Sequence, residues 1–179
     1  MANILIAVTG GIAAYKTASL VSYLAKENTV NVMMSKHATD FVTPLTFQTL
    51  SKNKVMTDMR NTERPEIIDH IHYPQKSDIM VIAPATANIV AKAAHGIADD
   101  LISTSILAAT IPIVFVPSMN ENMYANPITQ SNIKILKERG YHIIEPAIGN
   151  LACGACGKGK FPPLEHITDT INRILHITL

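Results

Sequence analysis

Short apolar runs and helical patterns alternate along the chain. Residues 4–8 form a continuous apolar run that ends at two glycines, which is typical of a strand buried on both faces. From residue 12 to residue 27 the apolar positions recur with helical spacing. The apolar face of this helix is expected to comprise Ile12, Tyr15, Ala18, Leu20, Val21 and Leu24. The chain is therefore predicted to begin with a strand, a glycine turn and a helix.

The same alternation continues through the rest of the chain. Further strands are expected at residues 30–34, 78–83, 113–116 and 141–144, and helices at 44–50, 86–95, 99–109, 126–139 and 165–177. Pro84 and Pro117 are expected to end the third and fourth strands. Strands that alternate with helices predict an α/β fold, a doubly wound, flavodoxin- or Rossmann-like parallel sheet with helices on both faces. We expect one domain over residues 1–179.

Composition and charge narrow the class of protein. With 47% hydrophobic and 16% charged residues, the 179 residues have ample material for one core. The formal net charge is +1 and no basic stripe stands out, so nothing favours nucleic acid or a membrane as a partner. No secretory signal or spanning segment is expected. The two cysteines, Cys153 and Cys156, form no disulfide framework, so a cytoplasmic location is expected.

The turn at Gly10 and Gly11 is a candidate phosphate site. Glycines let backbone N–H groups approach an anion, and the following helix directs its positive end towards it. The segment is neither a dinucleotide GxGxxG motif nor a Walker loop, because the glycines are adjacent and no GK[ST] follows. An ordinary strand-to-helix turn explains these residues about equally well.

Polar side chains also follow the later strands. Ser35 is placed to cap a helix or face a ligand, and Thr86 could cap the next helix while Asn88 offers a donor and an acceptor. After the fourth strand, Asn120 lies between two methionines, although methionine could simply fill the core. In such sheets ligands gather at the carboxyl ends of the strands, so these are the segments in which a site is expected.

Residues 149–160 carry four glycines and both cysteines. This segment is expected to be mobile unless a ligand orders it. Its CxxC spacing could indicate zinc or redox chemistry. However, no nearby histidine pair supplies the other two ligands of a structural zinc site, and thioredoxin-type pairs lie at the start of a helix after an early strand. No metal site is predicted.

Two histidines, His70 and His72, precede the third strand. A lone surface histidine is usually solvated and has no chemical role. A histidine near the edge of a cofactor could instead act as a general base at neutral pH, because its unperturbed pKa is near 6.5.

Together these segments resemble the homo-oligomeric flavin-containing cysteine decarboxylases, over nearly the whole chain. Residues 117–124 are similar to that family's PxMNxxMW motif, with Tyr124 in place of tryptophan. Residues 151–159 resemble its substrate-recognition clamp, which commonly reads ACGD. Here Ala155 replaces the acidic residue, and Cys156 adds a second thiol. The two motifs together are specific to this family, whereas the glycine turn alone is not.

The resemblance implies an FMN site and a set of site residues. The implied cofactor contacts are Gly10, Gly11, Ile12, Ser35, Lys36, His37, Thr86, Ala87, Asn88, Ile89 and Ser118. The implied catalytic residues are His70 as the base and Cys153 as a proton donor. The implied substrate contacts are Asn120, Met123, Ala152 and Gly154.

The resemblance is closest to the phosphopantothenoylcysteine decarboxylase branch. It implies FMN-dependent decarboxylation of 4'-phosphopantothenoylcysteine to 4'-phosphopantetheine in coenzyme A biosynthesis. FMN would oxidise the cysteine end to a thioaldehyde, the electron sink that allows carbon dioxide to leave, and would then return the electrons. A trimer with FMN near a subunit boundary is implied, as is a separate synthetase, because the sequence ends at Leu179.

Two alternatives share this fold. A lantibiotic-type peptidyl-cysteine decarboxylase would also use FMN and the histidine, but the cysteine clamp argues against it. A flavin-binding regulatory protein is the other alternative, although the long acidic extensions of such relatives are absent here.

Overall fold

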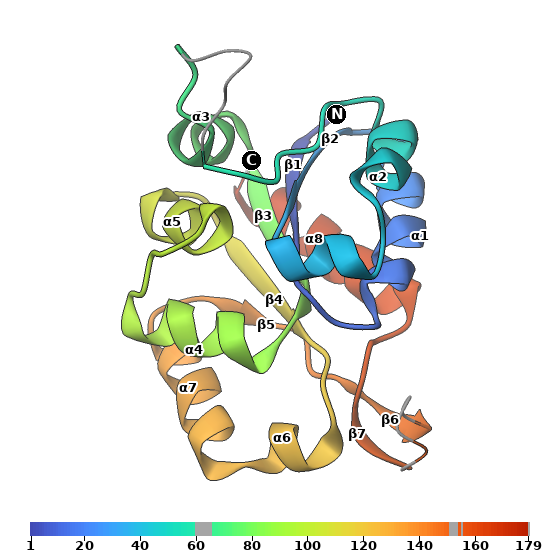
Figure 1. Cartoon of the computed structure of the whole chain (residues 1–179), viewed down its shortest axis with the longest axis vertical. Helices are drawn as coiled ribbons and strands as arrows, with labels where there is room; N and C mark the ends of the chain where they lie inside the picture. Colours follow the sequence, from blue (N-terminus) through green and yellow to red (C-terminus); the bar gives the residue numbers. More distant parts are fainter. Residues whose placement is uncertain (60–65, 151–153, 155, 179) are drawn as a thin grey trace.

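A parallel five-stranded sheet forms the centre of the molecule (Figure 1). The computed structural model describes residues 1–59, 66–150, 154 and 156–178. The strands are β1 (Asn3–Val8), β2 (Thr29–Met34), β3 (Ile79–Ala85), β4 (Ile113–Pro117) and β5 (His142–Ile143). Their order is β2-β1-β3-β4-β5, and every pair is parallel. This is the flavodoxin-like doubly wound order, so the predicted fold class is confirmed.

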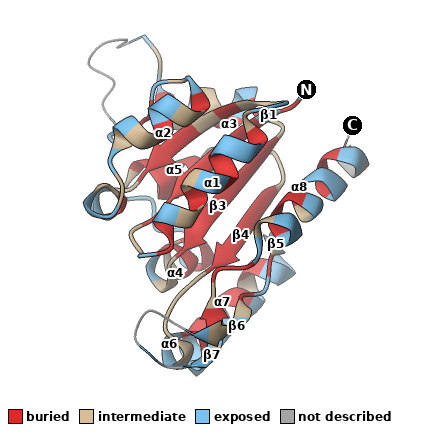
Figure 2. Ribbon diagram, turned by 90° about the vertical axis from the view of Figure 1, so that its right-hand side faces the viewer, coloured by how far each residue is buried: buried red, intermediate tan, exposed pale blue. Residues whose placement is uncertain are grey.

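Helices cover both faces of this sheet (Figure 1). One face carries α1 (Ala14–Leu24), α2 (Pro44–Ser51) and α8 (Leu164–Thr178), and the other carries α3 (Asp69–Lys76), α4 (Ala87–His95), α5 (Leu101–Ala108) and α7 (Pro127–Glu138). Along β1, Ile4 and Ile6 join the core beneath α1 and α8, whereas Leu5 and Ala7 join the core on the opposite face. Figure 2 shows the strands buried between exposed outer helix faces. Burial on both faces explains the continuous apolar runs of the sequence.

Two prolines were expected to end strands. Pro117 is the last residue of β4, as expected, whereas Pro84 lies inside β3, which continues to Ala85. The pairing of β3 with β4 shifts register between Ile82 and Ala85, so the missing N–H of Pro84 falls where the ladder is already interrupted. The carbonyl of Pro84 accepts a hydrogen bond from Thr9 Oγ1 at 2.6 Å.

Several short elements were not predicted. They are the 3-10 helix η1 (Lys36–Asp40), α3, α6 (Glu121–Ala125), β6 (Ala147–Asn150) and β7 (Cys156–Lys160). β6 and β7 form an antiparallel pair, so much of the segment expected to be a mobile glycine loop is a β-hairpin. Among the described residues, no helix has the length and hydrophobicity needed to cross a bilayer.

Candidate active site

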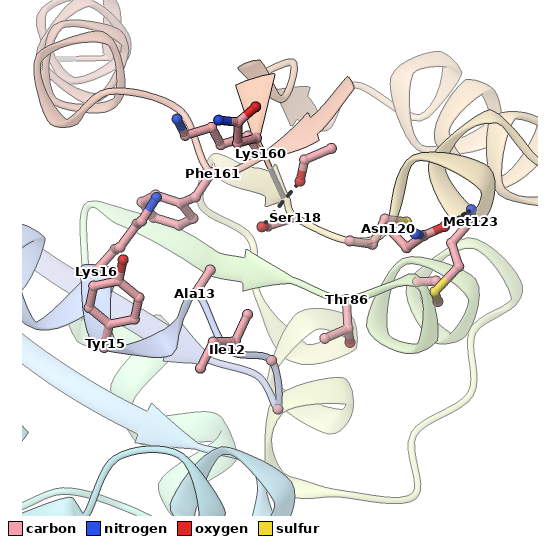
Figure 3. Close-up of a pocket in the computed structure, with 16 residues that line it drawn as sticks. Ile12, Ala13, Tyr15, Lys16, Thr86, Ser118, Asn120, Met123, Lys160 and Phe161 are labelled. Atoms are coloured by element: carbon pink, nitrogen blue, oxygen red, sulfur yellow. Dashed lines mark hydrogen bonds between the residues drawn. The ribbon is translucent and has the colours of Figure 1, made fainter. Parts of the chain in front are cut away.

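A cavity of about 670 Å³ opens at the carboxyl ends of β1, β3 and β4 (Figure 3). Its walls come from the turn after β1, the start of α4, the segment after β4 and the end of β7. The lining residues are Gly10, Gly11, Ile12, Ala13, Tyr15, Lys16, Thr86, Ala87, Ser118, Met119, Asn120, Met123, Asn150, Gly159, Lys160 and Phe161. The chain changes direction in the sheet between β1 and β3, and doubly wound folds bind ligands at this switch point.

The glycine turn brings the backbone close to η1. A Cβ atom added to Gly10 would lie 2.5 Å from the Cβ of His37, which no side chain could accommodate without movement. Helix α1 starts at Ala14, and no side chain caps its N-terminus. The N–H groups of Ala14 and Lys16 donate to the carbonyls of Gly11 and Ala13 at 2.9 and 3.0 Å, and the turn before the helix lines the cavity, where the positive end of the helix dipole favours an anion.

Ile12 and Tyr15 do not belong to the core, contrary to the predicted helix face. They are 57% and 58% exposed and line the cavity. Ile12 precedes α1, which begins two residues later than expected, and Tyr15 lies in the first turn of this helix. Figure 3 shows both side chains on the α1 side of the cavity, across from Asn120 and Met123. Large apolar side chains in an open cavity offer a surface for an apolar ligand.

The start of α4 forms another wall. Thr86 caps this helix, as predicted, because its Oγ1 accepts from the N–H of Ile89 at 3.4 Å. The N–H of Thr86 in turn donates to Thr9 Oγ1 at 3.2 Å, which ties α4 to the end of β1. Thr86 and Ala87 line the cavity. Asn88 is exposed and Ile89 is buried in the core, and neither lines the cavity.

Ser35, Lys36 and His37 lie behind the glycine turn and do not line the cavity. Ser35 caps η1 by accepting from the N–H of Ala38 at 3.2 Å. The turn therefore rests on η1, and the structure brings these residues next to the cavity wall without exposing them to its interior.

The segment after β4 brings Asn120 and Met123 to the cavity. The Asn120 side-chain oxygen caps α6, accepting from the N–H groups of Asn122 and Met123 at 2.9 and 3.4 Å. The N–H of Met119 donates to the carbonyl of Gly159 at 3.0 Å, and Ser118 Oγ donates to the same carbonyl at 3.3 Å. This segment is therefore joined to β7.

Two glycines allow β7 to approach this segment. A Cβ on Gly159 would lie 2.2 Å from the carbonyl oxygen of Met119, and one on Gly157 would lie 1.6 Å from Glu121 Oε2. The alternation of glycine in β7 was the sequence signal for this close approach, since glycine inside a strand often marks one.

A second cavity of about 440 Å³ adjoins the first. The two share Tyr15, Lys16, Lys160 and Phe161, and Figure 3 shows these four side chains at one end of the first cavity. Lys16 and Lys160 make no ion pair with a carboxylate in the described part of the chain. Two ammonium groups beside one cavity favour an anionic ligand. Neither lysine was predicted to be a site residue.

The histidine predicted as the base lies elsewhere. His70 is on α3 and lines neither cavity. Its Nδ1 is buried and has no hydrogen-bond partner among the described residues. Of the predicted clamp, Ala152 and Cys153 lie outside the described residues, whereas Gly154 is exposed with a φ of +87° and Cys156 is an exposed free thiol. Within the described ranges, no group of three metal-ligating side chains occurs.

Comparison with known proteins identifies the family. A model described as Flavoprotein matches residues 1–176. The chain belongs to this flavoprotein family. It is 45% identical over 176 residues to a probable phosphopantothenoylcysteine decarboxylase of Streptococcus mutans, covering 97% of this chain and 98% of that protein. It is 46% identical over 166 residues to the coenzyme A biosynthesis bifunctional protein CoaBC of Bacillus subtilis, covering 92% of this chain but only 41% of that relative's length.

Solved structures share the fold of this flavoprotein. A cysteine-to-serine mutant of PPC decarboxylase complexed with pantothenoylaminoethenethiol superposes with a TM-score of 0.87 at 27% identity, covering 98% of each chain. The FMN-dependent cysteine decarboxylase SpaF gives 0.85 at 28% identity, covering 99% of this chain and 97% of that one. These matches confirm the family resemblance that the motifs indicated.

The first cavity fits the flavin of a flavoprotein. The glycine turn lines the cavity at the start of α1, whose positive dipole end favours a phosphate. Ile12 and Met123 are 57% and 49% exposed and offer apolar contact to a ring system. A volume of about 670 Å³ is within the range of small-molecule sites.

Proposed function

We propose that the protein is an FMN-dependent phosphopantothenoylcysteine decarboxylase of coenzyme A biosynthesis, acting in the cytoplasm as a single domain of residues 1–179. One observation carries this proposal: the cavity that fits a flavin adjoins a second cavity carrying Lys16 and Lys160. A substrate with a reactive cysteine at one end and a phosphate at the other matches this pair of cavities. The name of the Streptococcus mutans relative supports the same activity.

FMN would lie in the first cavity. Gly10, Gly11 and the start of α1 would bind its phosphate, while Ile12, Thr86, Ala87 and Ser118 would contact the rest of it. Ser35, Lys36, His37, Asn88 and Ile89 would support this wall from behind. The bound flavin supplies the redox chemistry, taking two electrons from the cysteine end of the substrate and later returning them. Cofactor released by heat should therefore be FMN, and FAD or a nicotinamide nucleotide would contradict the proposal.

His70 would act as the base on a neighbouring copy's substrate. Within one copy it lies away from both cavities, so a homo-oligomer, proposed to be a trimer, would have to bring it to a cavity. Exposed apolar side chains lie on and next to α3 and on α5. Ile68, just before α3, Ile71 and Leu107 are 53%, 37% and 53% exposed. Burying them between copies would favour association.

The substrate would span both cavities. Its phosphate would lie between Lys16 and Lys160, since ammonium groups bind phosphate through charge-assisted hydrogen bonds. Its cysteine end would reach Asn120, which would bind the carboxylate, and Met123. Ala152 and Gly154 are proposed as further substrate contacts, and Cys153 as the proton donor in the reductive half-reaction. A separate synthetase would join cysteine to phosphopantothenate to supply the substrate.

A comparison of two substrates tests the assignment of the phosphate end. Lys160→Gln should raise the KM for 4'-phosphopantothenoylcysteine about tenfold, the effect of losing about 1.4 kcal/mol from a charged hydrogen bond. The KM for unphosphorylated pantothenoylcysteine should not change. Lys134→Gln, which removes a lysine with a 77% exposed side chain on α7, is the matched control. Equal changes for both substrates would contradict the assignment.

A further inference from the structure

The β6–β7 hairpin has little of its own to hold it in place. The two strands form a sheet separate from the central one, and an isolated two-stranded hairpin is only marginally stable in water. β7 contains no large apolar residue, and Ile148 of β6 is 75% exposed. Phe161, which directly follows β7, is buried and fixes only that end. The position of the strands therefore depends on polar contacts with other elements.

One of these contacts is an ion pair from the middle of β7. Lys158 Nζ lies 2.9 Å from Glu145 Oε2, in the segment between β5 and β6. The same carboxylate oxygen accepts a hydrogen bond from the hydroxyl of Tyr124 on α6. Lys158 Nζ also lies 5.4 Å from the centre of the Tyr124 ring, within range of a cation–π interaction. Glu145 thus joins the hairpin to α6, the helix that Asn120 caps.

A second lysine binds the same carboxylate from a different element. Lys137 Nζ on α7 lies 2.8 Å from Glu145 Oε1. Glu145 therefore has two lysine partners with similar exposure, 51% for Lys137 and 46% for Lys158, and only Lys158 belongs to the hairpin. Substitution of Lys158 therefore removes a contact of the hairpin, and substitution of Lys137 is its matched control.

An ordinary surface ion pair contributes little, but this network includes a buried hydroxyl group. Tyr124 is only 5% exposed, and burial together with its hydrogen bond to Glu145 raises its pKa well above the usual range, so its hydroxyl remains a donor. Burial alone would raise the pKa of Glu145. Hydrogen bonds from Lys137, Tyr124 and Lys158 outweigh that effect and lower it to about 2, so the carboxylate is ionised at neutral pH. Linked hydrogen bonds of this kind reinforce one another.

We propose that Glu145 is a positioning residue that holds β7 against α6, so that the hairpin is already in place when the substrate enters. The substrate role rests on the proposed function. Without Glu145 the hairpin would open more often, and substrate binding would have to bear the free-energy cost of ordering it. The apparent affinity falls in proportion to the fraction of molecules with a closed hairpin, whereas turnover of the bound complex changes little.

The first measurement uses no substrate. In the FMN-bound protein, Glu145→Gln and Lys158→Gln should each speed hydrogen exchange of the β6 and β7 amides several-fold. Lys137→Gln should change this exchange much less than Lys158→Gln does, because Lys137 is not part of the hairpin. Lys158→Arg, which keeps the positive charge, should restore slow exchange. Equal exchange in Lys137→Gln and Lys158→Gln, or no change in Glu145→Gln, would overturn the proposal.

The second measurement concerns the substrate. Glu145→Gln should raise the KM for 4'-phosphopantothenoylcysteine about three- to tenfold and keep kcat within about twofold, in line with the loss of one charged network contact. An unchanged KM in a variant with fast hairpin exchange would overturn the substrate role. A wild-type protein inactive on this substrate would overturn the proposed function and the substrate role with it, while the exchange result would still decide whether Glu145 anchors the hairpin.

Discussion

Gly10 and His37 are in contact across the turn that forms one wall of the first cavity. A Cβ on residue 10 would lie 2.5 Å from the Cβ of His37 and 2.9 Å from its carbonyl carbon. Since one of these atoms belongs to the backbone, rotation of the His37 side chain could not relieve the clash. The neighbouring Gly11 differs, because its added Cβ would meet only Thr86 Cγ2 at 3.7 Å, an ordinary contact.

Gly10→Ala should therefore destabilise the flavin-free protein by about 1–3 kcal/mol, the usual cost of overpacking. At this chain length that corresponds to a Tm lower by roughly 2–12 °C. Gly11→Ala should lower the Tm by less than about 1 °C, because no atom has to move to accommodate its Cβ. Thermal unfolding of both variants without cofactor measures the difference. Equal Tm values for the two variants would show that the contact with His37 imposes no constraint.

His70 gives a prediction about subunits. His70→Asn should bind FMN normally but lose decarboxylation, because asparagine cannot act as a base. Asn120→Ala should also be inactive, through loss of the proposed carboxylate contact. If each site combines His70 of one copy with Asn120 of another, hybrid oligomers of the two variants contain some intact sites, and activity should return on co-expression.

The same variants can refute this assignment. Inactive hybrids, shown by mass to contain both chains, would mean that each site draws both residues from one copy. Normal turnover by His70→Asn together with an inactive His72→Asn would transfer the role of base to His72.

Cys153 and Cys156 should differ in their effect on the product. Cys153→Ser should still release carbon dioxide but stall before reduction, because a serine hydroxyl is a far weaker acid than a thiol, whose unperturbed pKa is near 8.5. The product should be an ene-thiol lighter than 4'-phosphopantetheine by two hydrogens, and the flavin should stay reduced. Cys156→Ser should behave nearly as wild type. Mass spectrometry of the products distinguishes the two cysteines. The lighter product from Cys156→Ser, together with ordinary 4'-phosphopantetheine from Cys153→Ser, would assign the proton donor to Cys156.

The central sheet could be predicted because its signal is local and strong. The β1 residues alternate between two cores, so the strand had to be apolar throughout. Pro84 was wrongly predicted to end β3. The register shift that accommodates this proline arises from the pairing of β3 with β4, so neither strand sequence alone reveals it. The hairpin was missed because its stability comes from partners distant in sequence, such as Met119 for Gly159 and Glu145 for Lys158.

The site could be predicted only where a motif marks it. Thr86 and Asn120 follow strands and were recognised from that position. Ile12 and Tyr15 were assigned to the core because helical spacing does not reveal where a helix begins, and the first turn faces the cavity. Lys160 carries no motif, and its significance appears only once β7 brings it to the same cavity wall as Lys16.

If the protein is the proposed decarboxylase, the bound flavin would supply both the oxidation and the later reduction, so that the reaction would need no external oxidant. The most direct measurement is an oxygen-free incubation of the FMN-bound protein with excess 4'-phosphopantothenoylcysteine, with carbon dioxide and 4'-phosphopantetheine both quantified. We predict many turnovers, equal amounts of the two products and a flavin that ends oxidised. No product, or a single turnover that leaves reduced flavin and a product lighter by two hydrogens, would contradict the claim.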